Sequence, residues 1–138
     1  MATPLPVPEL LDEWLRWAEW VSSPDRDAAL GQELIGFDEF DWIVREHPEH
    51  GWRAILAALK DSRLEPHYGT LAAGPLEELL AYHGQQFIER VEAEAKANPK
   101  FAWLLGGVWQ FTMTEEVWAR VQAVWDRGGW DGIPKSGG

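Results

Sequence analysis

Two histidines are the residues best suited to bind a metal ion. His47 and His50 lie three residues apart, with Glu46 and Glu49 beside them, and imidazole with carboxylate is a common ligand set for zinc or iron. Pro48 interrupts a helix between the two histidines, so their rings need not share one helix face. The alternative is that His47 is a turn residue and His50 a first-turn surface residue. We predict no metal and no cofactor.

A second polar group is centred on His83. Together with Glu77, Glu78 and Arg90 it could place an acid beside a base, as general acid–base catalysis requires. A histidine near a helix C-terminus is also stabilised by the helix dipole alone. The chain has no cysteine, no Gly-x-Ser-x-Gly motif and no Walker loop. The sequence therefore favours a protein that is not an enzyme, with this group as the alternative catalytic site.

Acidic residues dominate the segment between residues 25 and 41. They are Asp25, Asp27, Glu33, Asp38, Glu39 and Asp41. Arg26 is the only base among them. If the carboxylates share a face, a basic partner would relieve their mutual repulsion, and Phe40 and Trp42 could supply apolar anchors. The alternative is a solvated acidic face with both aromatic residues in the core.

The whole chain carries a formal net charge of −11. Such a charge disfavours direct contact with nucleic-acid phosphates and attracts basic proteins, although acidity also keeps a Trp-rich protein soluble. We predict a protein-binding module, such as an inhibitor or immunity protein, that docks a basic partner. Its predicted contact residues are Asp38, Glu39, Asp41, Glu77, Glu78 and Tyr82. The alternatives are a small-molecule-binding protein, a metal-dependent enzyme or a DNA mimic.

Apolar residues recur at helical spacing along most of the chain, and no segment alternates with a period of two. The helical stripes cover residues 9–21, 25–33, 37–44, 52–59, 76–80, 87–95, 103–109 and 117–125. Residues 61–68 read as a loop. Gly74 and Pro75 are interpreted as the join between two helices, with proline in a first helical turn and Gly84 as a stop. The predicted fold is all-α, with six to seven helices around a Trp-rich core.

Two segments 51 residues apart are similar in sequence. HPEHGW at residues 47–52 and NPKFAW at residues 98–103 both place a proline four residues before a tryptophan, and a predicted helix precedes each. We interpret them as duplicated helical hairpins at residues 34–60 and 85–111, comparable in length to HEAT units. The alternative is coincidence, since proline before a helix is common turn chemistry. The predicted architecture is stacked antiparallel hairpins, HEAT-like or in an orthogonal bundle.

The length of 138 residues predicts a single domain covering residues 1–138. Three prolines predict an extended lead at residues 1–8, and glycines predict a flexible tail at residues 128–138, where Trp130 and Ile133 could fold back. The start lacks the basic region and apolar run of a secretory signal, and no apolar stretch approaches the ~20 residues of a membrane helix. We expect a cytoplasmic protein that contacts no membrane.

Three segments resemble a bacterial family. LAAGPLEELLAYHG at residues 71–84, FAWLLGGVW at residues 101–109 and EEVWARV at residues 115–121 are similar to segments of short, acidic, Trp-rich proteins described as a domain of unknown function. The resemblance covers about residues 37–125. It implies a helical, cytoplasmic bacterial protein and assigns no catalytic or binding residue.

Overall fold

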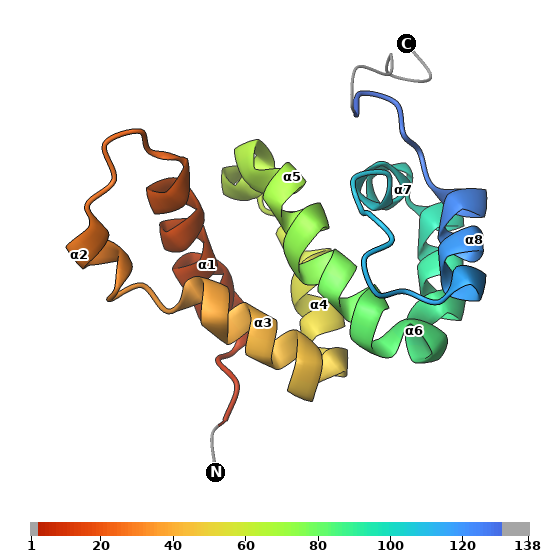
Figure 1. The fold of residues 1–138 in the computed structure, drawn as a ribbon, viewed down its shortest axis with the longest axis horizontal. Helices are drawn as coiled ribbons and strands as arrows, with labels where there is room; N and C mark the ends of the chain where they lie inside the picture. Colours follow the sequence, from red (N-terminus) through yellow and green to blue (C-terminus); the bar gives the residue numbers. More distant parts are fainter. Residues whose placement is uncertain (1–2, 131–138) are drawn as a thin grey trace. The chain divides into compact units, whose positions relative to one another are not determined.

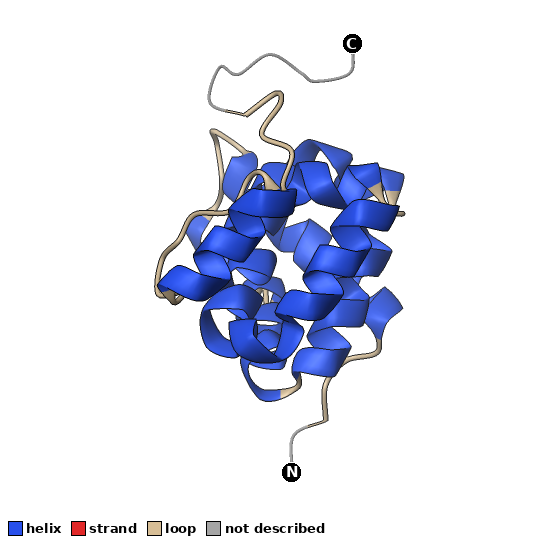
Figure 2. Ribbon diagram, turned by 90° about the vertical axis from the view of Figure 1, so that its right-hand side faces the viewer, coloured by secondary structure: helices blue, strands red, loops and turns tan. Residues whose placement is uncertain are grey.

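The computed structural model describes residues 3–130 of the chain. Within this range most residues are helical and none lies in a strand (Figure 2), which confirms the predicted all-α class. Six of these helices contain seven or more residues, in agreement with the predicted six to seven. The end of the predicted tail, including Ile133, lies outside the described residues.

Backbone contacts divide the chain into two compact units, with the boundary between His67 and Tyr68. They are called here the N-terminal unit and the C-terminal unit. The predicted hairpin at residues 34–60 falls within the first unit, and the one at residues 85–111 falls within the second. The prediction of one domain over residues 1–138 stays a prediction.

The N-terminal unit is built around a long first helix. Its elements are α1 (Val7–Ser22), α2 (Ala28–Gly31), α3 (Gly36–Glu46), α4 (Pro48–Ala58) and the 3-10 helix η1 (Ser62–His67). Helix α1 packs against both α3 and α4 (Figure 1). Trp14 of α1 is almost fully buried and meets the buried Phe40 of α3 edge-on, with 6.1 Å between ring centroids. Each large apolar side chain removed from water here stabilises the unit by roughly 1.5–3 kcal/mol.

Two segments of the N-terminal unit differ from the prediction. The helix predicted for residues 25–33 is shortened to α2. It begins after Asp27 because the carboxylate of this residue accepts a hydrogen bond from the Ala29 N–H at 2.9 Å and caps the helix there. The loop predicted for residues 61–68 is instead η1 followed by the first residue of α5 (Tyr68–Leu71). The Asp61 carboxylate accepts a hydrogen bond from the Arg63 N–H at 3.1 Å, which closes the first turn of η1.

The C-terminal unit is built around a long kinked helix. Its elements are α5, the π-helical segment η2 (Ala72–Leu76), α6 (Glu77–Ala97), α7 (Pro99–Leu105) and α8 (Glu115–Val124). Helix α6 packs against both α7 and α8 (Figure 1). Glu92 of α6 accepts hydrogen bonds from the Arg120 guanidinium of α8 at 2.6 and 2.9 Å, and these bonds lower the pKa of the Glu92 carboxyl. Buried apolar side chains and this ion pair together join α6 to α8.

Gly74 and Pro75 lie between the α-helices α5 and α6, as predicted, but the connection is itself helical and Pro75 does not start α6. Both residues lie inside η2, and helical backbone runs without a break from α5 through η2 into α6. Proline has no N–H to donate, and its ring clashes with a carbonyl of the preceding turn in an ordinary α-helix. The wider π-helical turn removes that clash, so the chain bulges at Pro75 and does not end there.

The helix does not end at Gly84 as predicted; it kinks one residue earlier, at His83. His83 has φ −133° and ψ 25°, and α6 resumes directly after it. Gly84 is buried, and a Cβ at this position would lie 3.0 Å from a methyl carbon of Val117 in α8. The glycine therefore allows close packing of α6 on α8.

Each unit contains one helix pair joined by a single residue. His47 joins α3 to α4, and Asn98 joins α6 to α7, with Pro48 and Pro99 in the first helical turns as predicted. The Asn98 side chain accepts hydrogen bonds from the N–H groups of two residues in α7, whereas His47 makes no such cap. The two predicted helix pairs are thus present, and their origin by duplication stays a prediction.

The predicted Trp-rich core is only partly correct. Trp14 and Trp52 are buried, and the other eight tryptophans keep part of their surface exposed. Trp130 folds back as predicted, since its ring stacks on Trp103 at 4.8 Å and its indole N–H donates to the Trp103 carbonyl at 2.8 Å. Tryptophan is large and carries a polar N–H, which favours such half-buried positions. Leucine, isoleucine, valine and phenylalanine form most of the core.

Candidate functional site

The predicted acidic cluster is spread over the loop before α2, the loop after it and α3. Its first four members, Asp25, Asp27, Glu33 and Asp38, are exposed. Asp27 also caps α2 through Ala29, and the last two members contact residues outside the cluster. The Glu39 carboxylate accepts a hydrogen bond from the Leu5 N–H at 3.3 Å, and Asp41 forms an ion pair with Arg45 at 2.8 Å. The carboxylates best placed to meet a partner are therefore those between residues 25 and 38.

Three large apolar side chains in the same part of the chain are exposed to solvent. The exposed fraction is 42% for Leu30, 49% for Ile35 and 47% for Phe37. Phe37 lies against Trp17 of α1, with ring centroids 4.9 Å apart. We call residues 25–38, with these apolar residues and the four exposed acids, the acidic–apolar segment. The sequence did not single out these three residues, because helical spacing placed Phe37 on the core side.

The two aromatic residues predicted as partner anchors lie differently. Phe40 is completely buried between helices of the N-terminal unit, so it belongs to the core. Trp42 is partly buried and its ring lies 4.9 Å from that of His47. A partner would meet Phe37 rather than Phe40.

An open pocket of about 450 Å³ lies beside the acidic–apolar segment. Its lining residues are Arg16, Glu19, Trp20, Ser23, Asp25, Arg26, Asp27, Leu30 and Leu34. The Trp20 indole N–H donates to the Asp27 carbonyl at 2.8 Å, so the loop before α2 is fastened to the end of α1. Charges of both signs surround an aromatic floor, which is an arrangement suited to binding a charged group with a flat face.

Of the two histidines considered for metal binding, His50 contacts the lead of the chain. A ring nitrogen of His50 hydrogen-bonds the Leu5 carbonyl at 2.7 Å, while Glu39 accepts from the N–H of the same residue. His47 is the single residue between α3 and α4. Among the residues that the structure describes, no three side chains of metal-binding type lie together. The arrangement around His50 therefore fastens the lead to α3 and α4.

The four residues of the alternative catalytic site lie along α6, on both sides of its kink. The Glu77 carboxylate accepts the Trp109 N–H at 2.8 Å, and His83 lies at the kink of α6. The Arg90 guanidinium lies over the Phe87 ring at 4.7 Å. Glu77 and Arg90 lie 13 positions apart, on opposite sides of the kink at His83. Glu77 is nevertheless chemically distinctive, because burial raises the pKa of its carboxyl despite that hydrogen bond.

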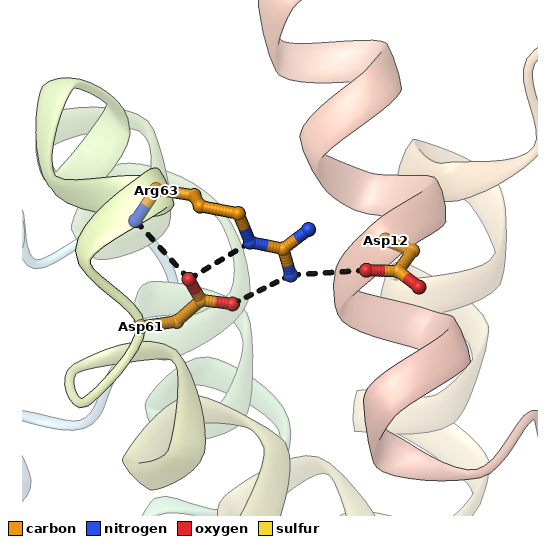
Figure 3. Close-up of polar contacts among 3 residues, drawn as sticks. All are labelled: Asp12, Asp61 and Arg63. Carbon is orange, nitrogen blue, oxygen red and sulfur yellow. Dashed lines mark hydrogen bonds and ion pairs between the residues drawn. The ribbon is translucent and has the colours of Figure 1, made fainter.

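Arg63 forms a charged contact that the sequence did not indicate. Its guanidinium lies between two carboxylates, 2.8 Å from Asp61 and 2.9 Å from Asp12 of α1 (Figure 3). Hydrogen bonds from Arg63 lower the pKa of the Asp61 carboxyl. The contact fastens the segment after α4 to α1, and Asp12 is distant in sequence, so helical periodicity carries no signal for it.

The loop between α7 and α8 exposes two aromatic residues that the sequence also missed. Trp109 is 58% exposed and Phe111 is 63% exposed, and Phe111 has φ 47°. The Arg127 guanidinium lies over Trp109 at 5.6 Å and donates to the Gly106 carbonyl at 2.8 Å. Glu77 and Arg127 thus hold this loop from two directions within the C-terminal unit.

Within residues 3–130, every helix is too short or too polar to cross a membrane.

Comparison with known proteins identifies a family and no characterised relative. Neither the curated proteins nor the solved structures include one that matches the chain. The model of a family of unknown function, DUF6869, matches residues 26–129, which is most of the chain and includes both helix pairs. The chain therefore belongs to this family of unknown function.

Proposed function

We propose that this chain is a cytoplasmic protein-binding module that docks a basic protein on its acidic–apolar segment. One observation carries the proposal: Leu30, Ile35 and Phe37 leave nearly half of their surface in water, in a segment that also exposes four carboxylates. Apolar anchors supply most of the free energy of a protein interface, and complementary charge supplies its orientation and association rate. The matching partner surface has apolar residues flanked by lysine or arginine.

The anchor residue Phe37 is already held in place in the free protein. Its ring rests on Trp17, so little side-chain freedom remains to be lost when a partner binds. Anchoring by a pre-positioned aromatic side chain lowers the entropic cost of association. Phe37 is for this reason the residue whose removal tests the proposal best.

The remaining predicted contact residues lie outside residues 25–38, the segment that the proposal uses. Glu39 and Asp41 have the partners described above. Glu77, Glu78 and Tyr82 belong to the C-terminal unit, where Tyr82 is 56% exposed. Asp38, in the first turn of α3, is the predicted residue that the proposal keeps.

The test is capture of a partner by wild-type and Phe37→Ser protein, followed by identification and measurement of Kd with the purified partner. Phe111→Ser in the C-terminal unit is the matched control, since it removes a similarly exposed phenylalanine. Circular dichroism checks that all three proteins are folded. We expect a basic partner that wild type and Phe111→Ser bind equally, that Phe37→Ser binds at least tenfold more weakly, and whose affinity falls as salt increases.

Three results contradict the proposal. They are a partner that binds folded Phe37→Ser as tightly as wild type, a partner that is acidic, and an affinity that ignores ionic strength. The first would mean that Phe37 does not anchor the partner, and the other two that charge complementarity at the acidic–apolar segment does not drive recognition.

A further inference from the structure

The pocket at the end of α1 already holds a guanidinium group. The central carbon of the Arg26 guanidinium lies 5.5 Å from the centroid of the Trp20 ring. One of its nitrogens donates to the Val21 carbonyl at 3.0 Å, near the C-terminus of α1. A cation within about 6 Å of a tryptophan ring is attracted to its electron-rich face. Arg26 therefore shows how this pocket holds an arginine side chain.

Trp20 is a fixed platform. Its indole N–H is held by the Asp27 carbonyl, and Gly31 lies so close that a Cβ there would be 2.2 Å from a ring carbon. The indole is thus contacted at its N–H edge and at its six-membered ring. A platform that cannot rotate binds a flat cation without losing further side-chain freedom.

The pocket has the volume and the negative charge to hold a cation. Its volume is about 450 Å³, within the range of pockets that bind small ligands. The carboxylates of Glu19, Asp25 and Asp27 line it, and all three residues are exposed. Leu30, which also belongs to the acidic–apolar segment, forms part of the wall. The pocket is therefore continuous with the proposed docking surface.

We propose that this pocket binds an arginine side chain of the basic partner on Trp20, and that Arg26 occupies the position in the free protein. This inference rests on the proposed function and names the residue type that the partner must supply. Arginine is preferred to lysine because its planar group stacks on an aromatic ring and donates several hydrogen bonds in fixed directions. Arg26 acts as an internal competitor, so the free protein binds arginine more weakly than an empty pocket would.

The test uses acetyl-arginine amide and acetyl-lysine amide as probes of equal charge. Binding is followed through the NMR signal of the Trp20 indole N–H, assigned with Trp20→Phe. Arg26→Ala removes the side chain that lies over the Trp20 ring. Arg16→Ala is the control: it removes the same charge from the lining of the same pocket, but Arg16 is paired with Glu13. We expect Arg26→Ala to bind the arginine probe about twofold to fivefold more tightly than wild type. Arg16→Ala should change the affinity less than twofold.

The remaining outcomes overturn the inference. If Arg16→Ala tightens binding as much as Arg26→Ala, only the net charge matters. If the lysine probe binds Arg26→Ala as tightly as the arginine probe, the pocket does not recognise a guanidinium group. If neither probe moves the Trp20 signal in Arg26→Ala, the pocket binds neither cation.

Failure here is distinct from failure of the proposed function. A partner whose affinity depends on Phe37 but not on Trp20 supports docking at the acidic–apolar segment and rejects the arginine pocket. If the arginine probe binds Arg26→Ala but the partner binds Phe37→Ser as tightly as wild type, the pocket alone is supported.

Discussion

Glu77 combines partial burial with a hydrogen bond that fixes a distant loop. Its carboxylate accepts the N–H of Trp109, 32 positions later in the chain. Burial raises the pKa of this carboxyl and is the larger influence, while the hydrogen bond from Trp109 opposes it. The ionised form is therefore less favourable in the folded protein than in the unfolded chain. Ionisation of Glu77 lowers stability at neutral pH, and this loss disappears as the pH falls through the raised pKa.

A pair of substitutions separates the charge of Glu77 from its hydrogen bond. Glu77→Gln keeps an acceptor oxygen without a charge, so we expect it to be at least as stable as wild type at pH 7. Its advantage should shrink as the pH falls toward 4. Glu77→Ala removes the acceptor and should lower the free energy of unfolding by about 0.5–1.5 kcal/mol. Urea denaturation at several pH values measures both; a Glu77→Gln protein less stable than wild type at pH 7 would refute the argument.

At the scale of the elements, glycines set how closely helices approach. Gly36 is buried at the start of α3, and a Cβ there would lie 2.2 Å from the Glu13 carbonyl oxygen in α1. That neighbour is backbone, so it cannot turn aside as a flexible side chain could. A Cβ added to Gly74 in η2 would have no neighbouring atom within 4 Å. The two glycines therefore have different roles: Gly36 permits contact between α1 and α3, whereas Gly74 has no packing constraint.

Gly36→Ala and Gly74→Ala form a matched pair of substitutions. We expect Gly36→Ala to lower the free energy of unfolding by about 1–3 kcal/mol, because α3 must move away from α1. Gly74→Ala should change it by less than about 1 kcal/mol, in the stabilising direction, since alanine reduces the freedom of the unfolded chain. Thermal unfolding of both variants provides the comparison. Equal losses of stability in the two proteins would show that the close approach of α1 to α3 does not cause the loss in Gly36→Ala.

The helical stretch from α5 to α6 shows why element boundaries are harder to predict than elements. Gly74–Pro75 and His83–Gly84 carry the residue types that end helices. The chain instead passes through a π-helical turn at Pro75 and a kink at His83. Buried residues on both sides, among them Leu71, Leu76 and Leu80, keep the stretch packed. Burial of these residues outweighs the local preference to stop.

At the scale of the whole molecule, charge opposes folding. The chain contains 23 acidic residues against 12 lysines and arginines. Like charges brought together in a folded chain repel one another, and the ion pairs at Arg63 and Arg120 offset only part of this repulsion. Under the proposed function the same excess of acid would attract the basic partner, so binding and stability would place opposite demands on the surface.

Salt should therefore stabilise the free protein. We expect the Tm to rise between about 0.01 and 0.15 M NaCl, over which the screening length falls from about 30 to about 8 Å. Differential scanning calorimetry measures the Tm, and KCl serves as a control for ion-specific effects. A Tm that falls with salt would mean that attractive ion pairs outweigh the net repulsion. Partner binding should respond in the opposite direction and weaken with salt.

By itself, the sequence determined the helical class and most helices, because apolar spacing and first-turn prolines such as Pro48 and Pro99 act within a few residues. It also indicated the acidic segment, of which Asp25, Asp27, Glu33 and Asp38 remain in the proposed site. Only the tertiary structure decided which aromatic residues reach solvent: Phe40 is buried, whereas Phe37, three residues earlier, is half exposed. The hydrogen bond from Trp109 to Glu77 and the ion pair of Arg63 with Asp12 likewise join distant positions. Periodicity shows which side of a helix is apolar, but the packing of other segments against it determines how much of that side is covered.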